Sequence, residues 1–112
     1  MTRVSARLVT VKPYALFFQA LANPVRMQIV DLLREKGRMS VSELCSELGI
    51  EQTHVSHSLR CLRFCGLVKV TPEGKSRSYS INKETVIPLL GIVDGHLRAY
   101  ATNLLSCDVL ER

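Results

Sequence analysis

The apolar residues change their spacing at Gly66, and this change limits the fold more than any other feature of the chain. Before Gly66 they recur every three or four positions, as on one face of a helix. From Leu67 to Ile81 apolar and polar residues alternate on either side of the turn-forming segment 72–75, as in a β-hairpin. Helical spacing returns at residue 85. We therefore expect a mostly α fold with one small hairpin.

Start and stop signals set the bounds of the expected helices. Residues 1–12 are expected to be frayed or weakly helical, and 14–21 to form an apolar helix. Asn23 and Pro24 are typical of a helix start, and that helix continues to Gly37. The remaining elements are expected to be a short helix capped by Ser40 or Ser42, a helix over 52–65, a hairpin with its turn at 72–75, and a helix over 85–105.

A helix-turn-helix over 41–65 followed directly by a hairpin over 67–81 is the arrangement of a winged helix, in which the hairpin is the wing. We predict a winged helix-turn-helix with the order α-α-α-α-β-β-α. The chain has 112 residues, which is close to the common size of one domain, and 46% of them are hydrophobic, which is enough for a core. Residues 1–112 are therefore expected to form a single domain.

Composition argues against several other classes of protein. No apolar run approaches the roughly 18 residues that span a membrane. The apolar start of the chain is a poor secretion signal, because Lys12, Pro13 and Gln19 interrupt it. Four unevenly spaced cysteines do not make a disulfide framework. Without a glycine-rich phosphate loop or a serine elbow, an enzyme is not expected. These features favour a cytoplasmic protein with no membrane partner.

The whole net charge of +5 arises within residues 52–83, which hold six basic residues and one acidic residue, while the rest of the chain is neutral overall. A local basic patch is expected for a partner that is a polyanion. The alternative is a solvated surface rich in lysine and arginine.

The helix over 52–65 has an apolar stripe and a polar face. At 100° per residue Val55, Leu59 and Leu62 fall within a narrow arc, opposite side chains that can donate to bases or phosphates in the major groove. The alternative is an ordinary amphipathic surface helix. The hairpin tip would lie along the DNA backbone or in the minor groove and add affinity without much reading of sequence. The residues predicted to bind DNA are Gln52, Thr53, Ser56, His57, Arg60 and Arg63 on the helix and Lys75 and Arg77 at the tip.

Four segments resemble the ArsR/SmtB family of repressors: Phe18-Gln-Ala-Leu-Ala-Asn-Pro-Val-Arg26, Val55-Ser-His-Ser-Leu-Arg60, Gly66-Leu-Val68 and Glu73-Gly-Lys-Ser-Arg-Ser-Tyr79. The resemblance covers residues 14–105. It implies a homodimer with the helices 14–21 and 85–105 at its interface, a dyad-symmetric DNA operator, and release from DNA when an inducer binds.

Two inducer sites known in this family do not match the sequence. Where one site has cysteines at the start of the short helix, this chain has Ser40-Val-Ser42. Cys45, one turn later, is expected to be a small core residue. On the last helix, Lys83 and Thr85 replace the first ligand pair of the other site, and only His96 of the second pair is present.

A third site does match. Cys61 and Cys65, followed by Gly66-Leu-Val68, resemble the recognition helix of the cadmium- and lead-sensing branch of the family, which is CmtR-like. That branch adds a cysteine from the partner subunit just beyond the last helix, where this chain has Cys107. Independently, cysteines four residues apart share one helix face, and three thiolates favour soft ions.

We therefore predict a thiolate site formed by Cys61, Cys65 and Cys107 for cadmium or lead, the ion acting as inducer. Three alternatives remain open. The cysteines could be ordinary packing residues, they could form a redox, persulfide or arsenic sensor, or the protein could regulate DNA without a ligand.

Overall fold

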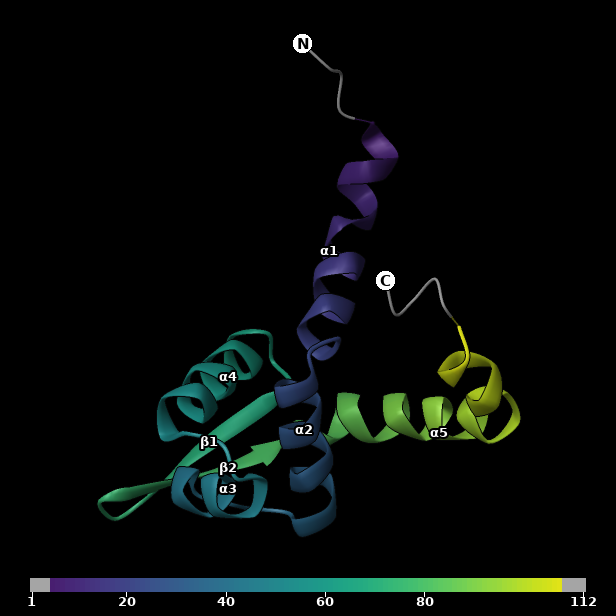
Figure 1. Cartoon of the computed structure of the whole chain (residues 1–112). Helices are drawn as coiled ribbons and strands as arrows, with labels where there is room; N and C mark the ends of the chain where they lie inside the picture. The colour runs from purple at the N-terminus through teal and green to yellow at the C-terminus, as the bar shows by residue number, and fades with distance from the viewer. Residues whose placement is uncertain (1–4, 108–112) are drawn as a thin grey trace. The chain divides into compact units, whose positions relative to one another are not determined.

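The computed structural model describes residues 5–107, which form five helices and one antiparallel pair of strands (Figure 1). The chain divides into two compact units, Met1–Ile81 and Asn82–Arg112. The predicted order of elements is confirmed. In the described residues no helix has the length and apolar character required to cross a membrane. The elements are α1 (Ala6–Leu21), α2 (Pro24–Lys36), α3 (Val41–Leu48), α4 (Gln52–Phe64), β1 (Val68–Glu73), β2 (Ser76–Ile81) and α5 (Lys83–Leu105).

The core of the first unit is built from α2, α3, α4 and the start of β1. The predicted stripe of α4 is confirmed, since Val55, Leu59 and Leu62 are all buried. A fully buried side chain of this size contributes about 1.5–3 kcal/mol relative to an exposed one, so this stripe fixes α4 firmly on the unit. Its partners in the core include Ile29, Val30, Leu33, Leu44, Leu67 and Val68.

Local hydrogen bonds fix the ends of α2, α3 and α4. The Asn23 side chain accepts from the backbone N–H groups of Val25 and Arg26, both at 3.0 Å. Ser40, rather than Ser42, caps α3, and it forms a reciprocal capping box with Glu43. Helix α4 ends in a Schellman motif in which the N–H of Leu67 donates to the Leu62 carbonyl at 2.9 Å and Gly66 adopts φ 78°.

The sequence predicts that residues 1–12 are frayed or weakly helical, and in the structure 6–12 are helical. Helix α1 begins at Ala6, where the Ser5 side chain accepts from the N–H of Arg7 at 3.2 Å. It continues through Pro13, which has no N–H to donate to the carbonyl of Val9. Because this part of α1 is exposed, water can hydrate that carbonyl, and the helix tolerates the missing hydrogen bond. Residues 1–4 lie outside the described residues.

The hairpin turns later than expected, at Gly74 and Lys75, so β1 extends through Pro72 to Glu73. The strands pair from Val68 opposite Ile81 to Glu73 opposite Ser76. The hairpin is also joined to the loop before α3, because Met39 and Tyr79 exchange two backbone hydrogen bonds of 3.0 and 2.7 Å. Tyr79 is therefore fixed by a neighbour on each side.

A side-chain cluster holds the outer part of the hairpin. The Glu73 carboxylate accepts from Arg38 Nη1 at 2.8 Å and from Ser78 Oγ at 2.7 Å. The hydrogen bond from Ser78 and then that from Arg38 hold the pKa of Glu73 below its ordinary value. Its negative charge is therefore already paired with Arg38 and Ser78.

The second unit consists of α5, which begins two residues earlier than the expected 85–105, directly after Asn82. Its buried side chains are Val86 and Leu90. The rings of His96 and Tyr100 stack with their centroids 4.6 Å apart. Much of the helix is apolar and exposed, through Ile87, Ile92, Val93, Leu97, Tyr100, Leu104 and Leu105.

Candidate functional site

Helix α4 presents a polar face to solvent, opposite its buried stripe. All six of its predicted DNA-binding side chains are exposed: Gln52, Thr53, Ser56, His57, Arg60 and Arg63. The helix is oriented by its contacts with α2, α3 and β1, so this face has a fixed direction on the first unit. A rigid helix with hydroxyl, imidazole and guanidinium groups on its open face can bind both base edges and phosphates.

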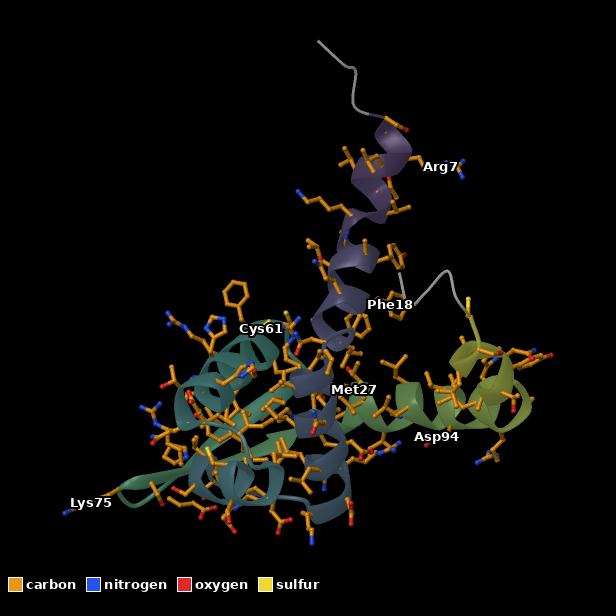
Figure 2. All side chains as sticks on the ribbon, in the orientation of Figure 1. Arg7, Phe18, Met27, Cys61, Lys75 and Asp94 are labelled. Carbon is orange, nitrogen blue, oxygen red and sulfur yellow. The ribbon has the colours of Figure 1, made fainter. Side chains whose placement is uncertain are left out.

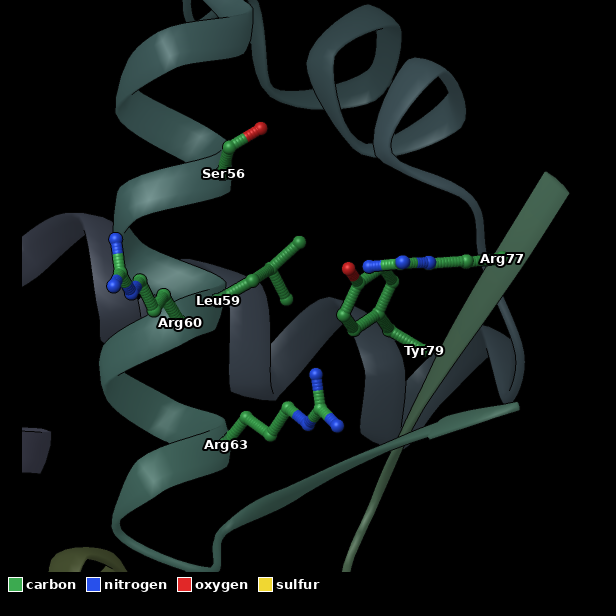
Figure 3. A pocket seen from close by; sticks show the side chains of 6 residues that line it. All are labelled: Ser56, Leu59, Arg60, Arg63, Arg77 and Tyr79. Carbon is green, nitrogen blue, oxygen red and sulfur yellow. The ribbon is translucent and has the colours of Figure 1, made fainter. Parts of the chain in front are cut away.

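A hollow of about 360 Å³ separates this helix from the second strand (Figure 3). In Figure 3 the guanidinium groups of Arg63 and Arg77 extend into it from opposite walls, while Arg60 turns away. Among residues 5–107 neither Arg63 nor Arg77 has an ion-pair partner, and no acidic side chain lines the hollow. The lining consists of Ser56, Leu59, Arg60 and Arg63 from α4 and Arg77 and Tyr79 from β2.

The two predicted wing residues lie in different places. Lys75 is in the turn, and Figure 2 shows it at the far end of the hairpin. Arg77 is already within β2 and lines the hollow beside α4. The prediction that both belong to the hairpin tip is therefore wrong for Arg77. The reason is that β2 begins at Ser76, directly after the turn, so Arg77 is its second residue and pairs with Pro72 across the hairpin.

The structure brings Cys61 and Cys65 together on the flank of α4. Cys61 is half-buried in the last turn of α4 and Cys65 is exposed one turn later, where its backbone N–H donates to the Cys61 carbonyl at 3.0 Å. Burial of the thiol itself is the main cause that raises the pKa of Cys65, and the charge and hydrogen bond of Cys61 add to it. The predicted thiol pair is thus present on one helix face.

Cys107 is half-buried and follows α5 in the second unit. Within the described part of the chain no group of three or more His, Cys, Asp or Glu side chains is arranged to hold a metal ion. Cys45, expected to be a small core residue, is half-buried on α3.

Sequence reasoning missed Arg26 as a neighbour of the thiol pair. Its charge opposes the rise in the pKa of Cys65. The same guanidinium donates from Nε to the carbonyl of Ala20 at 2.6 Å and from Nη2 to that of Gln19 at 3.2 Å. Arg26 therefore links the end of α1 to the neighbourhood of Cys65. It falls within the family-like segment 18–26, but no spacing rule relates it to a cysteine so much later in the chain.

Tyr79 was also missed as a site residue, because its place in an alternating strand indicated only hairpin packing. Its position on the same side of β2 as Arg77 follows from the two-residue period of a strand. That this side faces α4 depends on the packing of the hairpin.

Comparison with known sequences gives the family. The profile of the bacterial regulatory protein arsR family matches residues 23–70. The regulators NmtR and CmtR of Mycobacterium tuberculosis are 44% and 37% identical over 72 and 73 residues, which are 64% and 65% of this chain. A probable mercury resistance operon repressor of Streptomyces lividans is 36% identical over 76 residues, or 68% of the chain. The matches cover 59%, 61% and 60% of these three relatives.

Solved structures agree over more of the chain. The crystal structure of M. tuberculosis Rv0081 has a TM-score of 0.76 and 33% identity, and the match covers 91% of this chain and 100% of that one. Mb0332 of Mycobacterium bovis, described as a homodimeric winged helix-turn-helix DNA-binding domain, has a TM-score of 0.72 and 32% identity, with coverage of 88% and 91%.

The fold and the exposed face of α4 thus define a winged helix-turn-helix protein of the DNA-binding, regulatory and non-enzymatic class. The chain belongs to the ArsR family of bacterial transcriptional regulators.

Proposed function

We propose that this protein is a homodimeric repressor that binds a dyad-symmetric DNA operator in the cytoplasm and is released by a soft thiophilic ion, cadmium or lead. Residues 1–112 act as one winged helix-turn-helix domain, with 41–65 as the helix-turn-helix and 67–81 as the wing. The observation that carries the proposal is the exposed donor-rich face of α4, which bears a cysteine pair on its flank.

DNA binding follows from the charges and exposure of this face. Thr53, Ser56, His57 and Arg60 are placed to reach base edges if α4 enters the major groove. Gln52 lies at the start of α4 and can donate to a phosphate there. Arg63 and the wing residues add contacts to the backbone.

Dimerisation is supported by the apolar surfaces of α1 and α5, of which 14–21 and 85–105 are the proposed interface segments. Exposed apolar side chains on α1 include Leu8, Val9, Tyr14, Leu16 and Phe18. Surfaces of this kind are typical of an interface with another copy of the chain. A dimer also supplies two reading helices for two half-sites about one helical turn apart. Mb0332, which is similar in structure, is homodimeric.

The thiol pair fits a soft metal ion. Cys61 and Cys65 lie one helical turn apart, and Cys107 of the partner subunit would complete a set of three sulfur ligands. A bound soft ion would hold these thiols as thiolates. The similar mercury resistance operon repressor supports an ion of this class.

Arg26 gives the thiol pair a physical connection to the proposed interface. When Cys61 and Cys65 hold negative charge, they attract a guanidinium that is hydrogen-bonded to the last carbonyls of α1. A shift of Arg26 toward the thiolates would weaken these bonds and alter how the end of α1 is held against α2 within the first unit. The spacing of the two reading helices would then change.

The decisive experiment measures binding of the purified, reduced protein to the promoter in front of its own gene by fluorescence anisotropy, with and without cadmium. We expect cadmium to weaken binding by about 5–150-fold, the usual range of coupling free energies. Magnesium at the same concentration is the control and should have no effect. If oxidant, persulfide or arsenite releases DNA and cadmium does not, the cysteines serve another signal. If nothing does, the regulator acts without a ligand.

A further inference from the structure

The hollow between α4 and β2 is more than a continuation of the basic surface, because two cations converge in it. Arg63 reaches it from α4, and Arg77 reaches it from β2 (Figure 3). The acid nearest in sequence to Arg77, Glu73, is already hydrogen-bonded to Arg38 and Ser78. The positive charge in the hollow is therefore not neutralised by the residues of the first unit that line it.

The backbone on both walls of the hollow is held by pairing or packing. Arg77 and Tyr79 lie on one side of β2, whereas Ser78 between them is buried on the other. The backbone of Tyr79 is paired with Val70 and with Met39, so its ring has a fixed origin. On the opposite wall Leu59 belongs to the buried stripe of α4. A ligand that enters the hollow therefore meets donors whose side chains start from two backbone segments that are held in place.

The donors match one small anion with several oxygens. Guanidinium groups bind phosphate oxygens through paired N–H donors, and a tyrosine hydroxyl donates one further hydrogen bond. We propose that this hollow seats a single phosphodiester of the DNA backbone, held by Arg63 and Arg77 with the Tyr79 hydroxyl. The assignment rests on the proposed DNA-binding function and adds Tyr79 to its residues.

One bound phosphate at this place would fix the rotation of α4 in the groove, since backbone contacts set register while base contacts specify sequence. Arg60 also lines the hollow, but in Figure 3 its guanidinium points away from those of Arg63 and Arg77 and remains free for base edges. Arg63 and Arg77 are therefore positioning residues that act as one unit, whereas Lys75 at the tip of the hairpin binds a separate phosphate.

The test uses a mixed-sequence DNA duplex of about 30 base pairs, long enough for two half-sites. Anisotropy titrations over a range of KCl concentrations compare R63Q, R77Q and the double variant with wild type. Each single change should weaken binding about tenfold. It should also reduce the slope of log K against log[KCl] by about 0.9 for each of the two hollows in a dimer. The double variant should lose clearly less than the product of the two, because both side chains hold the same group.

K75Q combined with R77Q is the matched control, and here the two losses should multiply. Y79F should weaken binding severalfold while its thermal unfolding matches that of wild type. The single-phosphate site is wrong if the affinity losses of R63Q and R77Q multiply as those of the control pair do, or if Y79F binds DNA as tightly as wild type. Should wild type itself fail to bind the duplex, the DNA-binding function falls as well.

A free anion offers the same chemistry as a backbone phosphate, so inorganic phosphate is titrated separately and followed by tyrosine fluorescence. We expect binding only at millimolar concentrations and displacement by the duplex. Micromolar binding of inorganic phosphate that R77Q abolishes would overturn the assignment to the DNA backbone in favour of a free anion.

Discussion

Helices α4 and α1 distribute their apolar residues in opposite ways. On α4 they form one stripe, and Val55, Leu59 and Leu62 are buried within the same chain. On α1 they lie around the helix. Of the described side chains of α1, Ala20 alone is buried, whereas the exposed ones include Leu8, Val9, Tyr14, Leu16 and Phe18. Helix α4 can therefore be stable in a single chain. Helix α1, like much of α5, has a surface that suits a partner.

This contrast can be broken by one substitution in each region. Leu62→Ala, in the α4 stripe, should lower the free energy of unfolding by about 2–5 kcal/mol, because it leaves a cavity in a closed core. Leu97→Glu, on the 38% exposed side chain of α5, should leave each chain folded but separate the dimer. Chemical denaturation measures the first effect, and sedimentation at micromolar concentration measures the second.

Leu90 provides the control for α5, since it is only 7% exposed. Leu90→Glu should unfold the chain, because a carboxylate cannot be buried there without a partner. A monomeric wild-type protein, or a Leu97→Glu variant that stays dimeric, would contradict the proposed interface.

Substitution of the cysteines is expected to have an effect of intermediate size, on the release of DNA by cadmium. Cys61→Ser or Cys65→Ser should abolish the release of DNA by cadmium, a loss of about 1–3 kcal/mol of coupling, and leave DNA affinity nearly intact. Cys107→Ser should weaken cadmium binding, followed by the thiolate-to-metal absorbance, while Cys45→Ser should not. Wild-type cadmium affinity in the Cys107 variant would leave a site with two cysteines or a redox site.

The smallest effect is expected at the base of the wing tip. The Glu73 carboxylate has a lowered pKa because Ser78 and Arg38 donate to it. Its contribution to stability is thus complete above the ordinary pKa of 4.5 and is lost as the pH falls through the lower, folded value. Glu73→Gln should slightly lower the melting temperature at neutral pH, and this difference should disappear in acid. A difference that persists unchanged below that range would contradict the role of the charge.

The sequence by itself determined the order of elements and the core stripe of α4. Val55, Leu59 and Leu62 recur at helical spacing, and such a pattern can bury an apolar face in only one way. The cap at Asn23 and the stop at Gly66 are equally local, because their hydrogen bonds join residues a few positions apart, whereas the choice of Ser40 over Ser42 as the cap of α3 came from the structure. Cys61 and Cys65 share a face for the same reason.

Other features depended on tertiary structure. Arg77 lines the hollow rather than the hairpin tip, since the turn lies at Gly74 and Lys75 and strand alternation then directs Arg77 and Tyr79 toward α4. The charge of Arg26 acts on Cys65 only because α2 packs against α4. Local spacing cannot reveal such neighbours, because they come from distant segments that only packing brings together.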